Sequence, residues 1–538
     1  MANSLILTKA QNAITAHDWA TAARLYKELL QNDDSNVEYL KELGSIYVRA
    51  GEDEKAIPYY EKIISLHPEN TESMVSLGAI FRRLKRYEDS VKILHKAQEI
   101  SSANPTINYN LGFTYKEMGD YDDAIDSFES VISRNPDDVL AHNHLGSIYF
   151  AKKEYDKAIA AYKKGLQVDQ NHPILNYNLA HVYENMKNYP ESVRCYEIAL
   201  KTRPGWLDAI RDFSELLIKC QETKQAQELV EQSIKLHPDD VELLCILGRI
   251  YLNQFDYDNA TKTFKRAENL KQNDIGILIG LSKSLEKGMK IDQAMDKILD
   301  AVDTEPENVD VCKQYAHVLL SAQRYEKALD LIKTIDEKSD GKDLQILDLY
   351  GQYFVCRGDE EAANTYYDKI RKLNHHYKDY MINAADRYIQ TGNYEKAEEM
   401  ADKFVASRPQ LPEGYNLLGT INSARGELNK AKASYEKGIG LKNPNVFAVK
   451  ALEKINSELK ANEEIYNDGE SPIAVDADKL TEEEGGNIAE DSNIIASEED
   501  TADQLDALNA NGDSAEEDSL LHGLETTPPI EQALTGED

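Results

Sequence analysis

Apolar residues recur along this sequence at helical spacing, in short stretches separated by turn residues. The stretch 105–138 shows the pattern clearly: Leu111 and Tyr115 mark the apolar stripe of one helix, and Ala124 and Phe128 mark that of a second. Neither helix can bury its stripe alone. The stretch therefore predicts a helix–turn–helix unit that stacks against neighbours of the same kind.

The unit repeats along most of the chain with a period of 34 residues. A small residue of the second helix recurs as Ala22, Ala56, Ser90, Ala124, Ala158, Ser192, Ala226, Ala260, Ala294 and Ala328, and after one residue inserted within 339–343 as Ala363, Ala397 and Ala431. A small residue of the first helix keeps the same period from Ala10 to Gly419, and a large residue usually follows the second-helix position by four. Thirteen units are predicted, with close helix crossings where a larger residue would cost about 1–3 kcal/mol by overpacking.

These residues resemble the tetratricopeptide repeat, whose 34-residue signature is W-x2-L-G-x2-Y, then A-x3-F, then P. One unit that matches carries Leu43, Gly44, Tyr47, Ala56, Tyr60 and Pro68. The resemblance covers residues 3–445 and implies an all-α fold, a right-handed superhelical solenoid of about thirteen repeats. The units over 275–342 match the signature least, which favours looser packing there.

Three regions are expected. The array occupies 3–445, with unit 3–36 as an N-terminal cap because it lacks the Leu-Gly pair. A capping helix follows over 446–463, where apolar residues return at helical spacing. Residues 464–538 are expected to form an acidic disordered tail, because they carry 23 acidic residues and one basic residue, Lys479.

Charge and composition narrow the classes of partner. The net charge of −35 argues against nucleic acid or an anionic membrane as a general partner, because both require clustered basic residues. No stretch approaches the roughly 20 apolar residues of a membrane span. The five cysteines lack C-x-x-C spacing, and the first residues lack the charged and apolar regions of a signal peptide. A cytoplasmic protein with protein partners is the simplest interpretation.

No motif for enzyme chemistry is found. The sequence has no Gly-rich phosphate loop, no G-x-S-x-G and no H-E-x-x-H, and the repeats occupy most of its length. We therefore expect no enzyme activity, no cofactor and no metal.

The resemblance implies that the first helices line an inner groove that binds extended peptides. Two asparagines and a histidine precede the small residue of their first helices by two and are spaced by 34: Asn110, His144 and Asn178. Such an amide can donate to a peptide carbonyl and accept from an N–H group. Tyr109, Phe113, Tyr177 and His181 are expected on or near the same surface, either stacking against a bound segment or packing between first helices.

Basic residues in the early units are a further candidate for binding acidic side chains or a C-terminal carboxylate: Arg49, Arg82 and Arg83. The alternative is a solvated helix edge. The family's clamp for chaperone C-termini is not expected, since only Lys41 fits among its positions Lys41, Ser45, Ser76, Thr106 and Asn110. The acidic tail is long enough to reach these basic residues and shield the groove.

The function that these features favour is a protein–protein scaffold or adaptor that holds an extended segment in its groove. Two alternatives stay open: a structural subunit of a larger assembly, possibly of the cell envelope or motility apparatus, and the regulatory subunit of an enzyme complex.

Overall fold

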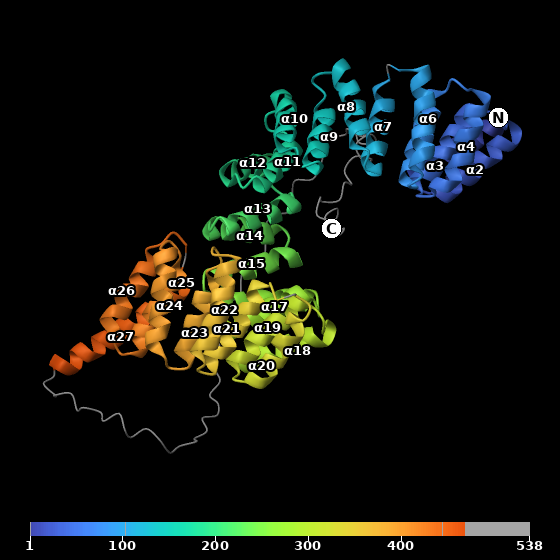
Figure 1. The fold of residues 1–538 in the computed structure, drawn as a ribbon. Helices are drawn as coiled ribbons and strands as arrows, with labels where there is room; N and C mark the ends of the chain where they lie inside the picture. Colours follow the sequence, from blue (N-terminus) through green and yellow to red (C-terminus); the bar gives the residue numbers. More distant parts are fainter. Residues whose placement is uncertain (1, 103, 340, 444, 468–538) are drawn as a thin grey trace. The chain divides into compact units, whose positions relative to one another are not determined.

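A computed structural model describes residues 2–102, 104–339, 341–443 and 445–467 of the chain. This part contains 27 α-helices and no β-strand, and the helices follow one another as antiparallel pairs (Figure 1). The contacts divide the chain into the unit 1–470 and a second unit, 471–538, which lies outside the described residues. So does the predicted acidic tail beyond Asn467.

Thirteen helix pairs are present, one for each repeat found in the sequence. The first helices are α1 (Ala2–Thr15), α3 (Val37–Arg49), α5 (Thr71–Arg83), α7 (Pro105–Met118), α9 (Val139–Ala151), α11 (Pro173–Asn185), α13 (Leu207–Lys219), α15 (Val241–Asn253), α17 (Ile275–Lys287), α19 (Val309–Ser321), α21 (Leu344–Cys356), α23 (Asp379–Gln390) and α25 (Pro412–Ala424). The second helices are α2 (Trp19–Asn32), α4 (Asp53–Leu66), α6 (Tyr87–Ile100), α8 (Tyr121–Arg134), α10 (Tyr155–Val168), α12 (Tyr189–Thr202), α14 (Thr223–Leu236), α16 (Tyr257–Leu270), α18 (Ile291–Thr304), α20 (Tyr325–Asp336), α22 (Glu360–Leu373), α24 (Tyr394–Ser407) and α26 (Leu428–Ile439).

The last helix, α27 (Val446–Asn467), begins where the capping helix was expected and runs beyond 463. Ala448 and Ile455 are buried against the thirteenth pair. The all-α superhelical solenoid of thirteen repeats is thereby confirmed.

Polar caps begin many of the first helices. The side chain of Asn104 accepts a hydrogen bond from the backbone N–H of Thr106, and Pro105 occupies the first helical turn of α7. The side chain of Asp138 does the same for Ala141 at the start of α9. Because the first backbone N–H groups of a helix lack internal partners, these caps fix where each unit restarts.

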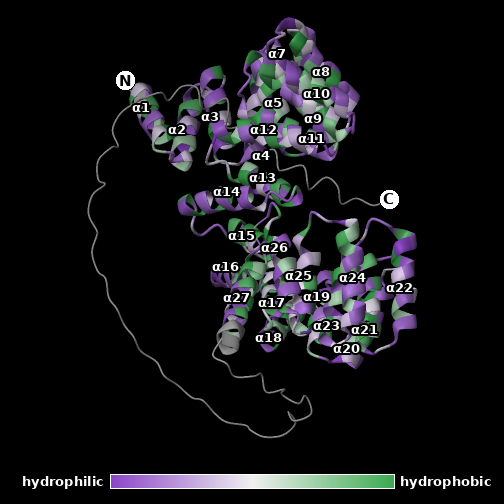
Figure 2. Ribbon diagram, turned by 90° about the vertical axis from the view of Figure 1, so that its left-hand side faces the viewer, coloured by the Kyte–Doolittle hydropathy of each residue, from purple (hydrophilic) through white to green (hydrophobic). Residues whose placement is uncertain are grey.

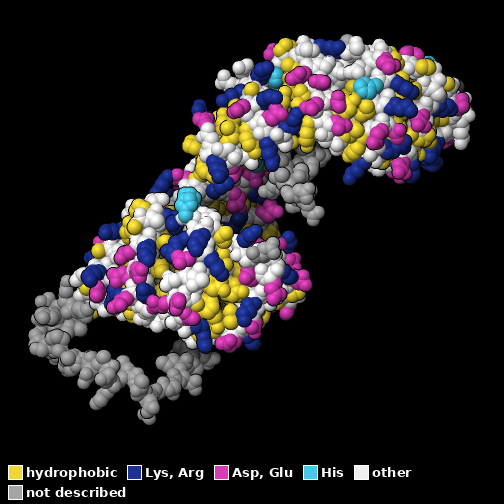
Figure 3. Space-filling view, in the orientation of Figure 1, with side chains coloured by type: hydrophobic (Ala, Val, Ile, Leu, Met, Phe, Trp, Pro, Cys, Tyr) yellow, Lys and Arg dark blue, Asp and Glu magenta, His cyan; other side chains and the backbone are white. Residues whose placement is uncertain are grey.

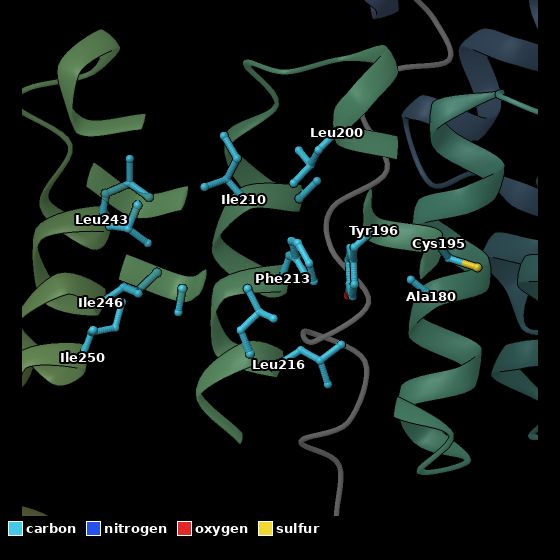
Figure 4. Packing of buried hydrophobic residues seen from close by; sticks show 14 of the residues in the cluster. Ala180, Cys195, Tyr196, Leu200, Ile210, Phe213, Leu216, Leu243, Ile246 and Ile250 are labelled. Carbon is cyan, nitrogen blue, oxygen red and sulfur yellow. The ribbon is translucent and has the colours of Figure 1, made fainter. Parts of the chain in front are cut away.

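In twelve of the thirteen pairs, a small residue on one helix faces a larger residue on the other. A Cβ atom added to Gly112 would lie 2.7 Å from the ring of Phe128, which is fully buried. In Figure 4, the ring of Tyr196 lies between Ala180 and Phe213, and the two rings stack at 5.4 Å. The period of 34 residues therefore reflects helix packing, because glycine occurs where the ring on the facing helix comes closest.

The expectation of looser packing over 275–342 is wrong. Leu281, Leu285 and Ile298 are buried there as completely as their counterparts elsewhere. Ser282 replaces the usual glycine, and its hydroxyl donates to the carbonyl of Ala294 across the crossing at 3.0 Å. The hydroxyl is therefore satisfied inside the core, and the substitution does not loosen the pair.

The turn between the two helices of every pair contains one residue with positive φ. It is glycine in five units, at Gly51, Gly119, Gly358, Gly392 and Gly426, and another residue type in eight, at His17, Lys85, Lys153, Lys187, Gln221, Phe255, Met289 and Gln323. These residues follow the same period of 34, with the single insertion before Gly358.

First helices of successive pairs contact one another directly in most of the array, as α5 does with α7 and α21 with α23. Second helices of successive pairs show no comparable contact among the described residues. A solenoid whose first helices converge in this way curves toward them, so the first helices form its inner face. This convergence is most extensive from α19 to α23.

Candidate functional site

Two stretches of the inner face differ in character. We call the inner faces of α7, α9, α11 and α13 the open surface, and those of α17, α19, α21 and α23 the closed surface. Most of the predicted groove residues lie on the open surface, where Tyr109, Asn110, Phe113, Tyr177 and Asn178 are all partly exposed.

An aromatic cluster joins α7, α8 and α9. The ring of Phe113 lies 5.6 Å from that of Phe128 and 4.7 Å from that of His144, and Tyr109 stacks on Phe113 at 6.1 Å. The Tyr109 hydroxyl donates to the carboxylate of Asp138, the cap of α9. These aromatic residues pack between helices, and Tyr109 and Phe113 stay partly exposed.

His144 belongs to this core and does not line the groove as expected. It is 8% exposed, because Phe113 and Phe128 enclose its ring. Burial lowers the pKa of His144 to about 3, and the nearby charge of Lys116 adds to this effect. A neutral, enclosed imidazole cannot hold a peptide backbone, so the predicted row of three polar residues is interrupted at its centre.

The two asparagines take different partners. Asn110 donates to the Thr106 carbonyl of its own helix at 2.9 Å. Asn178 donates to the side-chain oxygen of Asn143 on α9 at 2.8 Å. Asn143 was not predicted as a groove residue, because it lies one position before His144, the residue 34 positions before Asn178. The structure therefore places an amide pair, Asn143 with Asn178, on the open surface.

The missed pairing follows a spacing of 35 residues. Because neighbouring first helices repeat every 34 residues and pack with a small offset, a side chain reaches the residue 35 positions along. The same spacing joins Tyr177 to Asp212, Arg82 to Glu117, Lys219 to Glu184, Ser321 to Glu286, Asn383 to Asp348 and Arg387 to Gln352.

A second polar cluster lies where α11 meets α13. The Tyr177 hydroxyl donates to Asp212 at 2.6 Å, and His181 Nε2 lies 3.2 Å from the same carboxylate. Trp206 packs beside Tyr177 with ring centroids 4.5 Å apart. Burial favours a raised pKa for Asp212, but the hydrogen bonds from His181 and Tyr177 and the charge of Arg211 outweigh it and lower the pKa. A negative charge is thus stabilised beside accessible aromatic edges.

The predicted basic residues are largely neutralised. Arg82 pairs with Glu117 at 2.5 Å and lies 5.5 Å from the Phe113 ring, and Arg83 makes two bonds of 2.7 Å to Asp53. Arg49 is exposed, and no ion pair joins it to another described residue. Acidic and basic side chains are also mixed over the face shown in Figure 3. This arrangement offers little unpaired positive charge for an acidic partner.

The closed surface carries a buried polar network that the sequence did not reveal. Glu286, Gln314, Asp348, Gln352 and Arg387 are each less than 10% exposed. Arg387 bonds to Ser321 and Gln390 at 2.9 Å and to Gln352 at 3.2 Å. Its guanidinium lies 3.7 Å from Glu286, which also accepts bonds from Gln314 at 2.9 Å and Ser321 at 2.7 Å.

Burial also shifts the pKa values of titratable groups in this network. It lowers the pKa of His317 to about 4, with Glu286 opposing and the neighbouring cations reinforcing the shift. It raises the pKa of Asp348 to about 6, against hydrogen bonds from Asn383 and Gln352. Glu286 keeps a lowered pKa despite burial, because positive groups that include Arg387 and Lys287 surround it.

No group of three or more His, Cys, Asp or Glu residues is arranged to hold a metal ion in the described ranges. None of the helices described is long and apolar enough to cross a membrane.

Comparison with protein families finds matches along the chain. One tetratricopeptide repeat model matches residues 7–71, 54–105 and 109–173, and another matches residues 174–205, 241–274 and 412–445. A search of curated proteins found no match.

Several solved structures resemble the chain. MamA protein is 28% identical over 31% of this chain and 92% of its own, with a TM-score of 0.30. The Cut9–Hcn1 hetero-tetramer of APC/C is 12% identical over 85% of this chain and 96% of its own, with a TM-score of 0.37. A tetratricopeptide repeat protein from Parabacteroides merdae is 22% identical over 46% and 98%, with a TM-score of 0.35.

Proposed function

The chain belongs to the tetratricopeptide repeat superfamily, and we propose that it is a non-enzymatic scaffold that binds an extended segment of a partner protein on its open surface. Tetratricopeptide repeats serve protein–protein interaction in general. The observation that carries the finer proposal is the contrast between the two stretches of the inner face. The open surface leaves aromatic edges, amides and a carboxylate accessible, whereas the closed surface is filled by its own side chains.

The groups on the open surface suit an extended backbone. The Asn143–Asn178 pair has amide donors and acceptors that can exchange a mutual bond for bonds to a peptide group. Tyr177 and His181 are partly exposed, pack against one another and lie beside the charged Asp212. A partner segment with apolar or aromatic side chains, and with a donor for Asp212, matches this surface.

Affinity capture with the immobilised full chain identifies partners, and groove variants then test the surface. We expect Asn110→Ala with Asn178→Ala to weaken capture of a partner that uses the groove, with far-UV circular dichroism unchanged. Gln167→Ala with Gln232→Ala is the matched control, because both are exposed amides on second helices. Equal loss in both double variants would contradict the assignment.

The same experiment separates the alternatives. Undiminished capture by the groove variant, together with self-association in size-exclusion chromatography, favours a structural subunit of a larger assembly. Consistent recovery of a catalytic partner chain favours the regulatory subunit of an enzyme complex. We propose a cytoplasmic location, which the five free cysteines support because free thiols suit a reducing compartment.

Shielding of the groove by residues 464–538 stays a prediction from charge. The ion pairs of Arg82 and Arg83 reduce its electrostatic basis. Deleting residues 464–538 and measuring the affinity for a partner at low salt tests this shielding, and an unchanged affinity would contradict it.

A further inference from the structure

A groove lies between α2 and the start of α4, at the end of the array where α1, α2 and α3 lie side by side (Figure 2). It has a volume of about 980 Å³, opens to solvent and is lined by residues within 17–31 and 46–55. Ile46 and Tyr47 of α3, both buried, form its base. We call it the α2 groove. It lies on the side of the second helices, apart from the open surface.

Alanine stands in this groove where later units carry a larger side chain. Ala23, which lines the groove, follows the small residue Ala22 by one position. In the next five units the corresponding position holds a β-branched aliphatic residue that is partly buried: Ile57, Val91, Ile125, Ile159 and Val193. Most of these side chains pack against the hydrophobic core. The first unit thus lacks an aliphatic side chain that the following units supply themselves, and the α2 groove is the space left.

The carboxylates along the α2 groove are mostly engaged. The Asp18 side chain accepts a hydrogen bond of 3.0 Å from the backbone N–H of Thr21 and caps α2. Glu52 pairs with Lys55 at 2.9 Å. Glu28 is the one acidic lining residue without such a contact among the described residues. A single carboxylate is therefore left to balance the free cations of the groove.

Two cations of the groove have no carboxylate partner. Arg24 and Lys27 lie one turn apart on α2 and are exposed, and no ion pair joins either to another described residue. Lys27 Nζ lies 5.3 Å from the centre of the Tyr47 ring, and Lys55 Nζ lies 5.9 Å from it. A hydrogen bond with the Tyr47 side chain raises the pKa of Lys27, so the amine keeps its proton. Contact with an aromatic ring positions a cation without neutralising it, which leaves positive charge available at the groove.

We propose that the α2 groove binds a segment of a partner protein in which leucine or isoleucine is flanked by carboxylates. The aliphatic side chain fills the space beside Ala23 and the partly exposed ring of Trp19, where later units place their own isoleucine or valine. The flanking carboxylates pair with Arg24 and Lys27. An aliphatic segment alone leaves these cations unpaired, and an acidic segment alone leaves the apolar base uncovered, so the groove requires both features.

The dimensions of the groove limit the length of the segment. From Trp19 to Gln31, α2 rises about 18 Å, which is the length of five or six residues of extended chain. No lining residue of the groove belongs to α7–α13, so the inference is independent of the function proposed for the open surface.

Fluorescence anisotropy with the full chain tests the inference, with a fluorescein-labelled peptide of the sequence Glu-Asp-Leu-Leu-Asp-Glu as the probe. We expect saturable binding. Replacing both leucines of the peptide with serine should weaken it about tenfold or more, because the apolar area that the groove buries is removed. Replacing the four acidic residues with their amides should weaken it about tenfold, because Arg24 and Lys27 then lose their partners. The absence of saturable binding of this peptide would overturn the inference.

Two variants of the chain test the site itself. Ala23→Ile introduces the residue that the second unit carries at this position, and it should weaken peptide binding about tenfold or more by filling the groove. Arg24→Gln with Lys27→Gln keeps the surface of α2 polar and should weaken binding about tenfold. The matched control is Lys92→Gln with Lys96→Gln on α6, two exposed lysines without an ion pair among the described residues, which should leave the affinity unchanged.

Unchanged affinity in either groove variant would overturn the inference, and so would an equal loss in the control variant. Binding that appears only after deletion of residues 468–538 would overturn it as well, because the occupant would then be this segment of the chain itself. Self-association that Ala23→Ile abolishes would identify a second copy of the chain as the occupant instead. If circular dichroism shows that Ala23→Ile is unfolded, the variant at Arg24 and Lys27 decides.

Discussion

The small–large crossing of each pair makes a quantitative prediction at Gly112. In Gly112→Ser, the new Cβ would lie 2.7 Å from two atoms of the Phe128 ring, so the ring has to move by about 0.8–1.3 Å to reach an ordinary contact. Tyr109, Phe113 and His144 surround that ring at 5.2–5.9 Å between centroids and leave it little room. Overpacking costs about 1–3 kcal/mol, and serine regains about 0.5 kcal/mol of helix propensity. We expect a net destabilisation of about 1–2 kcal/mol.

A second substitution should rescue the first. Phe128→Ile alone removes ring volume and should cost about 1–3 kcal/mol through the cavity it leaves. The chain itself places Ser282 opposite Ile298, both fully buried, so serine and isoleucine fit one another at this crossing. The double variant should therefore be about 1–2 kcal/mol more stable than the sum of the single variants implies.

Native-state hydrogen exchange of the α7 and α8 amides measures the local opening free energy in the full chain. Combining Gly112→Ser with Phe264→Ile provides the control, because Phe264 faces Gly248 in another pair. That combination should be additive within about 0.5 kcal/mol. If the Gly112–Phe128 pair is also additive, ring contact does not explain why glycine stands at this position.

Two further predictions concern buried polar groups. The pKa of Asp348 is raised to about 6 in the folded state, against about 3.9 in the unfolded state. The protonated carboxyl therefore stabilises the fold below pH 4, and this contribution is lost as the pH rises through 6. In urea unfolding, the free energy of unfolding of Asp348→Asn should gain about 2–3 kcal/mol over that of the wild type between pH 4 and pH 7, and a pH-independent difference would contradict the assignment. Asn445→Ala should destabilise docking of α27 by about 2–3 kcal/mol. The change leaves the buried Asn416 without its hydrogen bond of 2.8 Å, and it removes the side-chain oxygen that accepts from the backbone N–H of Ala448. Deuterium exchange of the α27 amides measures the loss, and unchanged protection would refute the prediction.

The repeat units could be predicted from the sequence because their packing is local. Gly112 and Phe128 are 16 residues apart, and the same combination of a small and a larger residue recurs in twelve of the thirteen units, with Ala401 as the exception. The inner face was harder to predict. His144 shares its spacing with Asn110 and Asn178, yet two phenylalanines enclose it. A spacing of 35 would have identified Asn143 as the partner of Asn178, since that offset follows from how neighbouring first helices pack.

The closed surface and the contact between residues 221–258 and 442–450 could not be predicted in the same way. The bond between Lys287 and Asp386 spans 99 positions, and that between Lys442 and Glu222 spans 220. Such pairs depend on the curvature that accumulates over several repeats. A small change of angle in each repeat moves their ends apart, and no single repeat carries a signal for it.

The turns with positive φ have a consequence for how the array comes apart. Six consecutive units, from Lys153 to Gln323, place a residue other than glycine in the left-handed conformation, at about 1–2 kcal/mol each, whereas the last three units use glycine. In a linear array, stability is approximately the sum of each unit's own free energy and its coupling to neighbours. This strain lowers the intrinsic stability of the six central units relative to units with glycine in the turn. Unfolding should begin among them and divide the chain into separate cooperative blocks, with more than one transition.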